Sequence, residues 1–198
     1  MFRTPKPQIL LLALLICGLT ACNSNDPESR TPPKSATIPG APPNTALPMP
    51  PVNGASINNL GWIADGGKRS VFSDFRGKVL VLDFYATWCE PCRRSIPHLI
   101  GLQDKYADQG LQVIGLNVGG PDDEAKVPAF AKEFGIQYTL AVPDEELVTF
   151  LLANNDAIPQ TFVFDRQGQL AARLIGFGPN AGERIDNAVE AALKTPAP

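Results

Sequence analysis

The sequence is poor in residues that bind metals, with a single histidine and four cysteines among 198 residues. A structural zinc site takes four cysteine or histidine ligands, and a catalytic one takes three plus water. Cys89 and Cys92 form one Cys-x-x-Cys pair, no second such pair exists, and the one histidine, His98, is not spaced to complete a set. The sequence therefore disfavours a zinc site, and we expect no bound cofactor.

An excess of positive charge is also missing, because 17 lysine and arginine residues face 20 aspartate and glutamate residues. A net charge of −3 gives no reason to expect nucleic-acid binding, which usually requires a basic patch. The apolar run over residues 9–16 is too short for a membrane-spanning helix, which needs roughly 20 residues. Its length is typical of the apolar region of a signal peptide.

The first 21 residues have the layout of a bacterial lipoprotein signal peptide. Arg3 and Lys6 precede the apolar run, and positions 19–22 read LTAC, which resembles a lipobox. The resemblance implies cleavage before Cys22, lipid attachment to that cysteine, and a location on the periplasmic side of a bacterial membrane. An uncleaved anchor and a plain secretory signal are the alternatives, and the sequence leaves the inner and the outer membrane both open.

Residues 22–53 contain nine prolines and few large apolar side chains. Such a composition cannot bury a core and favours an extended chain, so we predict a disordered tether. Cleavage would leave 15 basic and 20 acidic side chains, a net charge of −5, because Arg3 and Lys6 are lost from the 17 basic residues. With Cys22 lipidated, only one cysteine pair keeps free thiols. An exported protein with one pair is either cross-linked or redox-active.

The pattern over residues 54–195 is that of one globular α/β domain. Buried strands alternate with helices, and a hairpin near the end adds antiparallel strands, so we predict a mixed sheet flanked by helices. The expected elements are a hairpin over 60–72, strands over 78–86, 111–118 and 138–142, helices over about 90–108, 122–135 and 144–155, a hairpin over 160–176, and a helix over 180–194.

The chemistry concentrates in the stretch Trp88-Cys89-Glu90-Pro91-Cys92, between a buried strand and a helix. A cysteine at a helix N-terminus is favoured as a thiolate, so Cys89 is the candidate nucleophile, although Glu90 opposes the effect. Cys92 lies one turn later and is the candidate resolving thiol. A purely structural disulfide across so short a loop would constrain the unfolded chain very little, so a redox couple is favoured.

Residues 81–92, VLDFYATWCEPC, resemble the thioredoxin superfamily. The longer stretch over 73–97 looks most like its membrane-tethered TlpA/ResA-like branch of thiol–disulfide oxidoreductases. The resemblance covers about residues 55–194. It implies a thioredoxin-like sheet with an N-terminal hairpin and an inserted strand–helix segment over about 119–142.

The resemblance also implies roles for individual residues. Pro159 matches the superfamily's cis-proline, whose preceding backbone, here Ile158, would pair with an extended substrate; the alternative is an ordinary trans proline. Asp83 matches a buried acid that takes a proton from the resolving thiol; the alternative is a solvated or capping aspartate. Trp88 would shape the docking surface or pack in the core. Some reductive members of this branch carry a glutamate where this sequence has Ser95. The absence of that glutamate weakens the inference that this protein shares the specific role of those members.

These observations predict a monomeric, lipid-anchored enzyme that reduces disulfides in protein substrates through Cys89 and Cys92. The resemblance implies a membrane electron donor that recycles it. The alternatives are a disulfide oxidase or isomerase, a thiol peroxidase, and a non-enzymatic metal chaperone that uses the two thiols.

Gly176, after the last expected strand, either leaves room for substrate backbone or is a simple turn glycine.

Overall fold

The computed structural model describes residues 57–64, 66–153 and 155–198. The predicted signal peptide, the lipid site Cys22 and the tether over 22–53 lie outside the described residues. Within the described ranges, no helix combines the length and the apolar character that crossing a membrane requires.

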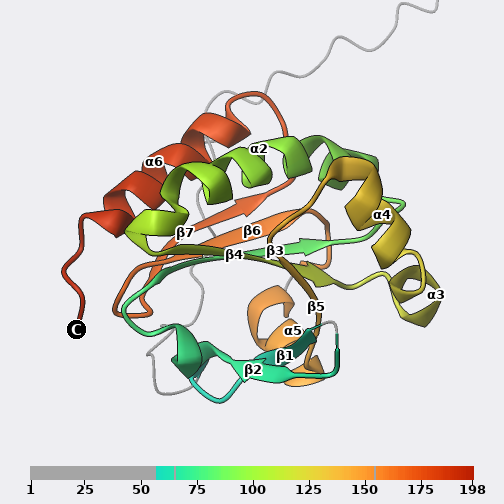
Figure 1. Ribbon diagram of the computed structural model, residues 1–198, viewed down its shortest axis with the longest axis horizontal. Coiled ribbons are helices and arrows are strands. Elements are labelled where there is room, and N and C mark those ends of the chain that lie inside the picture. The colour runs from blue at the N-terminus through green and yellow to red at the C-terminus, as the bar shows by residue number, and fades with distance from the viewer. Residues whose placement is uncertain (1–56, 65, 154) are drawn as a thin grey trace, which may run out of the picture. The chain divides into compact units, whose positions relative to one another are not determined.

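One mixed sheet of seven strands forms the centre of the domain, in the order β2-β1-β5-β4-β3-β6-β7 (Figure 1). Strand β3 is parallel to β4, and β4 to β5, whereas the pairs β1–β2, β1–β5, β3–β6 and β6–β7 are antiparallel. The strands are β1 Gly61–Ala64, β2 Arg69–Val71, β3 Val79–Tyr85, β4 Leu111–Asn117, β5 Thr139–Pro143, β6 Gln160–Phe164 and β7 Leu170–Ile175. The predicted mixed α/β sheet and both predicted hairpins are confirmed.

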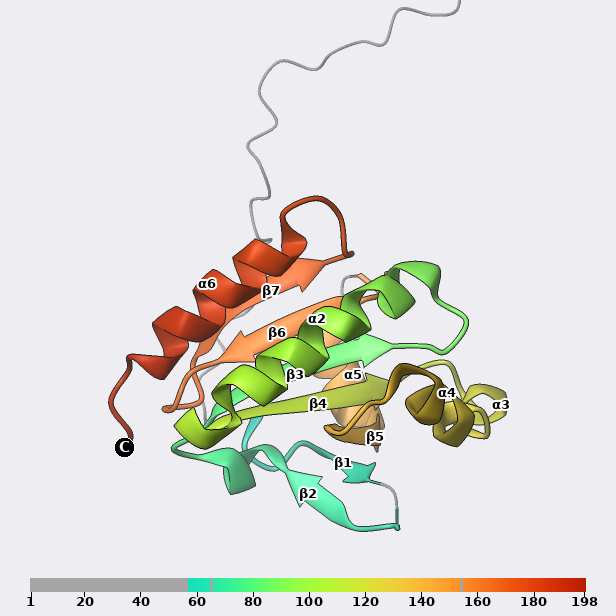
Figure 2. The ribbon, with the colours of Figure 1, turned by 45° about the horizontal axis from the view of Figure 1, so that its top comes forward.

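Helices cover both faces of this sheet. Helices α2 and α6 lie side by side on one face, and α5 lies on the other (Figures 1 and 2). The helices are α2 Glu90–Tyr106, α3 Pro121–Glu124, α4 Val127–Phe134, α5 Glu145–Leu152 and α6 Ala181–Leu193, with 3-10 turns η1 Phe72–Phe75 and η2 Ala107–Gln109. Apolar residues of α2 and α6, such as Leu99 and Ile185, pack with Val81 of β3. The opposite face buries Leu82 of β3 against Leu147 of α5.

The expected single helix over 122–135 is wrong, because the segment forms two short helices, α3 and α4, with a turn at Ala125–Lys126. Each helix has a proline in its first turn, Pro121 in α3 and Pro128 in α4. Proline suits the first turn of a helix, where no N–H is needed, but it disrupts a helix interior. Pro128 therefore starts a new helix instead of continuing the first.

Candidate active site

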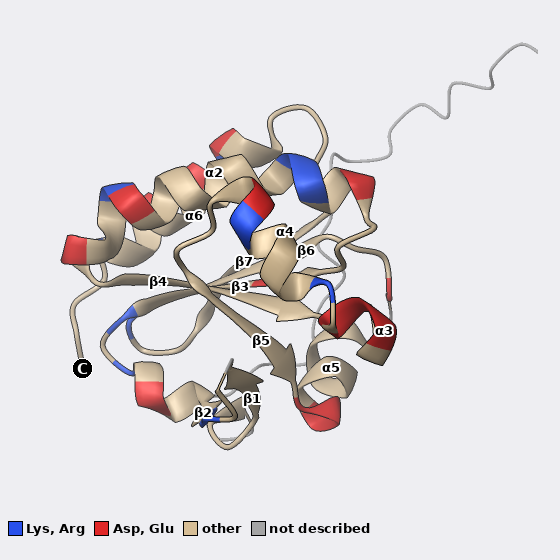
Figure 3. Cartoon of the chain, turned by 45° about the vertical axis from the view of Figure 1, so that its right-hand side comes forward, with Lys and Arg blue, Asp and Glu red and all other residues tan. Residues whose placement is uncertain are grey.

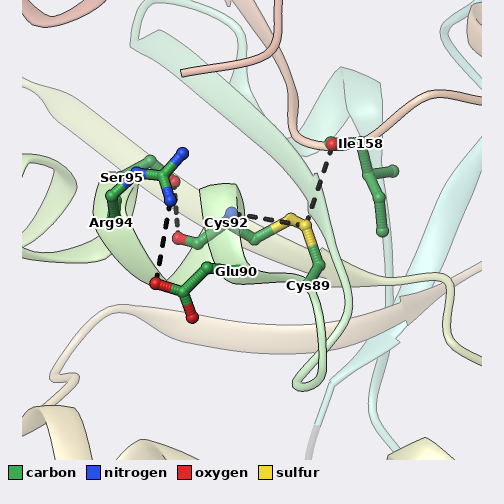
Figure 4. A network of polar contacts seen from close by, with 6 residues as sticks. All are labelled: Cys89, Glu90, Cys92, Arg94, Ser95 and Ile158. Atoms are coloured by element: carbon green, nitrogen blue, oxygen red, sulfur yellow. Dashed lines mark hydrogen bonds and ion pairs between the residues drawn. A yellow bond between two sulfur atoms is a disulfide. The ribbon is translucent and has the colours of Figure 1, made fainter. Parts of the chain in front are cut away.

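The two cysteines form a disulfide at the start of α2, with a Cα–Cα distance of 5.2 Å (Figure 4). Cys89 is the N-cap residue, and its sulfur accepts a hydrogen bond from the backbone N–H of Cys92 at 3.3 Å. Cys89 is 4% exposed and Cys92 0%, so the second cysteine is the more deeply buried of the two, as suits a resolving thiol. Free N–H groups and the helix dipole stabilise negative charge at this position. Once the disulfide is reduced, this placement favours Cys89 as the thiolate.

A backbone carbonyl from a distant loop lies against the first sulfur. The peptide bond between Ile158 and Pro159 is cis, as expected, and the carbonyl oxygen of Ile158 lies 3.7 Å from Sγ of Cys89 (Figure 4). A disulfide sulfur carries no proton, so this is a contact in the oxidised form. In the reduced form, the same geometry lets a Cys89 thiol donate to that carbonyl.

The loop before the cis-proline is held by a buried amide side chain. Nε2 of Gln160 donates to the backbone oxygens of Asn155 at 2.6 Å and Ala157 at 2.9 Å. Its Oε1 accepts from Nη2 of Arg173 at 2.7 Å. Gln160 is fully buried, so these bonds tie β6 to the loop beside Cys89. Sequence reasoning missed this residue, since a glutamine at a strand start carries no motif.

Asp83 is buried inside the sheet, with 2% exposure. Side chains alternate along a strand, so Asp83 lies on the same face of β3 as Val81 and Tyr85, the face that α2 covers. Its Oδ1 accepts a hydrogen bond from Oγ1 of Thr161 at 2.8 Å. Burial raises the pKa of Asp83 to about 7, and the bond from Thr161 opposes the rise. The solvated alternative is therefore wrong, and the carboxyl can exchange a proton near neutral pH.

The two arginines that follow the disulfide, Arg93 and Arg94, have different ion-pair partners. Glu90 is exposed and lies 3.7 Å from Nη1 of Arg94, so that ion pair is solvated and weak (Figure 4). Arg93 instead pairs with Glu133 of α4 and packs over the ring of Phe134, with a distance of 4.8 Å from Cζ to the ring centroid. Of these two arginines, Arg93 contacts α4 of the inserted segment, whereas Arg94 pairs within α2.

Three further positions discussed from the sequence, 88, 91 and 95, have distinct surroundings. Trp88 is 66% exposed, so core packing is excluded for its side chain, and it projects a large apolar surface next to Cys89. Pro91 occupies the first turn of α2, where proline is tolerated. Ser95 is fully buried and donates to the carbonyl oxygen of Cys92 at 2.8 Å. Position 95 therefore contributes a helix hydrogen bond and no acid.

Two residues outside the predicted site, Thr87 and Asp123, fix the backbone that leads into it. Thr87 lies between β3 and Cys89, and both its N–H and its hydroxyl donate to the carboxylate of Asp123 in α3. Sequence reasoning assigned the acidic residues over 122–124 to the start of a helix, where they favour the dipole. The sequence feature that could have drawn attention to these residues is the Gly-Gly pair at 119–120, which separates strand β4 from the acidic residues.

A groove of about 630 Å³ lies between β1, α4 and β5, away from the sulfurs. Its walls are mostly apolar, with Ile63, Val127 and Leu140 among them, and neither cysteine lines it. Within the described part of the chain, no group of three or more histidine, cysteine or acidic residues is placed to hold a metal ion.

A mixed sheet with a disulfide closed onto a helix N-terminus and a cis-proline loop beside it defines a thioredoxin-like protein. Residues 54–173 match the model of the AhpC/TSA family, so the chain belongs to that family.

Among curated proteins, the chain is similar to "Thiol-disulfide oxidoreductase ResA" of Geobacillus kaustophilus, with 33% identity over 110 residues, which cover 56% of this chain and 62% of the relative. The chain thus spans less than two thirds of the length of that relative. Among solved structures, it is similar to a Chlorobium tepidum protein provisionally assigned as thiol:disulfide interchange protein DsbE, with 31% identity, a TM-score of 0.60, and coverage of 69% of this chain and 94% of the other. A second thiol:disulfide interchange protein of Chlorobium tepidum, of the thioredoxin family, has 26% identity and a TM-score of 0.59 over 74% of this chain and 99% of the other.

Proposed function

We propose that this protein is a thiol–disulfide oxidoreductase that reduces disulfides in protein substrates through Cys89 and Cys92. The observation that carries the proposal is the disulfide at the N-terminus of α2, with the Ile158 carbonyl 3.7 Å from the first sulfur. A helix N-terminus lowers the pKa of a thiol, and the backbone of the partly buried Ile158 beside it offers a pairing partner for an extended substrate segment. The names of the ResA and interchange relatives favour the same activity.

The reaction proceeds as two exchanges that start from the dithiol form. The Cys89 thiolate attacks one sulfur of the substrate disulfide, forms a mixed disulfide and releases the other substrate sulfur as a thiolate. The Cys92 thiolate then attacks Sγ of Cys89 and releases the second substrate thiolate. The substrate gains two electrons, and the protein ends with the Cys89–Cys92 disulfide that the structure contains.

Asp83 is proposed as the group that accepts the proton of the Cys92 thiol before the second exchange. It lies on the α2 face of β3, and burial raises its pKa to about 7, so both protonation states are populated near neutral pH. A base whose pKa lies near the working pH transfers protons most effectively. Both sulfurs are otherwise shielded from water, which increases the need for an internal acceptor.

The oxidised product needs two electrons from another thiol protein before it can act again. We propose a membrane electron donor of the kind that recycles exported thioredoxin-like proteins, and a location on the periplasmic side of a bacterial membrane with a lipid anchor at Cys22. The lipobox-like sequence and the proline-rich tether support this placement. A reductase in an oxidising compartment depends on such a supply.

Insulin-disulfide reduction by the purified chain tests the activity. Cys89→Ser should abolish it, and Cys92→Ser should accumulate a mixed disulfide with substrate, because the resolving thiol is missing. The measurements are turbidity with dithiothreitol as electron source and mass spectrometry of the trapped species. Equal activity in the wild type and both variants would show that these cysteines do not carry it.

The direction of electron transfer follows from the reduction potential of the Cys89–Cys92 couple, measured by equilibration with glutathione buffers. A potential of about −270 mV supports the reductase, and one of about −120 mV favours a disulfide donor instead. Rapid consumption of hydrogen peroxide by the Cys92→Ser variant would favour a thiol peroxidase.

A further inference from the structure

Thr87, two residues before the nucleophilic cysteine, has all of its polar groups engaged. Its backbone N–H donates to Oδ2 of Asp123 at 2.8 Å, and its hydroxyl donates to Oδ1 of the same carboxylate. Its carbonyl oxygen accepts from Nη1 of Arg93 at 3.2 Å. Thr87 is 7% exposed, so these bonds are largely shielded from water. The turn that leads from β3 to Cys89 is therefore held from two sides.

The side chain of Asp123 is itself held in place by contacts other than those with Thr87. It is 1% exposed, and its Oδ2 accepts a further hydrogen bond from Nδ2 of Asn117 at 2.7 Å. Oδ1 of Asn117 in turn accepts from the backbone N–H of Gly119 at 3.1 Å. A Cβ atom at Gly119 would lie 2.4 Å from Oδ2 of Asp123, so only glycine permits this close approach. Figure 3 shows the acidic helix α3, which carries Asp123.

The charge state of Asp123 suits the role of acceptor. Burial by itself raises the pKa of a carboxyl, but the hydrogen bonds from Thr87 and Asn117 and the nearby Lys126 outweigh it, so the pKa of Asp123 lies below its ordinary value. The group is a carboxylate at neutral pH, with three bonds that it accepts and none that it donates. Hydrogen bonds to an ionised acceptor are stronger than neutral ones.

Arg93 holds the turn from its other side, through its bond to the carbonyl oxygen of Thr87. Its guanidinium pairs with Glu133 and packs over the rings of Phe130 and Phe134, all on α4, while it donates to Thr87. Both α3 and α4 belong to the segment between β4 and β5. This inserted segment therefore contacts the turn before Cys89 directly through Asp123, and indirectly through Arg93 of α2, which bridges α4 and Thr87.

We infer that Asp123 is a positioning residue for disulfide exchange: it holds the Thr87–Cys89 turn, and with it the exposed Trp88, in the orientation that meets a protein substrate. The inference rests on the proposed exchange activity. Cys89 acts only if its sulfur is aligned with the substrate disulfide, and small misplacements of reacting groups are costly in rate. The bonds to Asp123 act on the backbone before Cys89 and leave the sulfurs untouched.

Hydrogen exchange and kinetics on the full chain test this role. Asp123→Ala removes all three acceptor bonds, so amide exchange at Thr87 and Cys89 should accelerate, while exchange in the core of β3 at Val81 stays unchanged. The kcat/KM for insulin should fall about 10- to 100-fold. Asp122→Ala is the matched control, because the neighbouring exposed aspartate has the same charge and does not contact Thr87.

Asp123→Asn separates hydrogen-bond geometry from charge. An asparagine can still accept from the Thr87 and Asn117 N–H groups with its oxygen and donate to the Thr87 hydroxyl with its amide, so it should recover most of the protection and rate. An Asn variant as impaired as the Ala variant overturns the inference, and so does unchanged exchange at Thr87 in the Ala variant.

Variants of the threonine cover the case in which Asp123→Ala fails to fold. Thr87→Val keeps the shape and removes only the hydroxyl bond, so it should lose part of the protection at Cys89, and Thr87→Ser should restore it. Equal protection in the two variants would contradict the inference. If the wild type does not reduce insulin, the proposed function fails, while the exchange data still decide whether Asp123 holds the turn.

Discussion

The two faces of strand β3 serve different purposes, although their residues alternate along one short segment. The face toward α5 is uniformly apolar, with Leu80, Leu82 and Phe84 packed against aromatic residues of β6. The face toward α2 begins with Val79 and Val81 but continues with the carboxyl of Asp83. One face therefore supplies burial, and the other combines burial with a group that is costly to ionise there.

On the face toward α2, the carboxyl of Asp83 lowers the stability of the fold at a position where it serves the proposed reaction. A buried carboxyl with a raised pKa weakens the fold whenever it is charged, and perturbed titratable groups of this kind concentrate at functional sites. The Asp83 face ends at the disulfide, whereas the apolar face ends in the cluster formed by Phe84 and Phe162. Substitutions on the two faces should therefore change different properties of the protein.

The largest effect is expected on the apolar face. Phe162→Ala removes a fully buried ring that packs edge-to-face on Phe84, at a centroid distance of 5.6 Å. Such truncations cost about 3–5 kcal/mol of unfolding free energy, because burial is lost and a cavity remains. Urea unfolding measures the loss. The reduction potential of the cysteine couple should stay the same, and a shift in it would break the separation between the two faces.

A smaller effect of opposite sign is expected for Asp83→Asn. Burial raises the pKa of Asp83 from 3.8 to about 7, so between these values the folded state holds a proton that the unfolded state has released. Stability therefore falls as pH rises through this window and levels off above pH 7. The variant should lack this fall and exceed the wild type at pH 8 by up to roughly 4 kcal/mol.

The same substitution should slow the reaction. With an amide at position 83, the Cys92 thiol loses its proposed proton acceptor, and release of the mixed disulfide should become slower at neutral pH. Unfolding followed from pH 4 to pH 8 and single-turnover release of substrate give the two readouts. If Asp83→Asn neither stabilises the protein at pH 8 nor slows release of the mixed disulfide, the two faces of β3 do not differ in the way described.

The smallest effect is expected at Gly176, beyond the end of β7. Gly176 has φ 74°, and its N–H donates to the carbonyl oxygen of Pro159 at 2.8 Å. A Cβ atom there would meet no atom within 4 Å, so Gly176→Ala should cost about 1–2 kcal/mol through backbone strain alone. Urea unfolding checks this cost, and kinetics distinguishes the two roles of the glycine. A raised KM for insulin with an unchanged KM for a small disulfide would indicate that substrate backbone uses this space.

Much of the fold was predictable because its signals are local. Continuous apolar runs predicted β3 and β4, and alternation around a turn predicted the hairpin of β6 and β7. The cysteine spacing predicted the redox pair, since one helical turn brings positions 89 and 92 together. The broken helix over 122–135 escaped prediction because the amphipathic spacing of its apolar residues outweighed the proline at 128.

The order of the elements, the cysteine pair at a helix start and the proline that precedes β6 follow from the amino-acid sequence, because each depends on residues within a few positions of one another. The raised pKa of Asp83, the contact between the Ile158 carbonyl and the first sulfur, and the bonds from Thr87 to Asp123, 36 positions away along the chain, arise only in the folded protein. These features depend on which faces pack together, and long-range packing has no short-range signature in a single sequence.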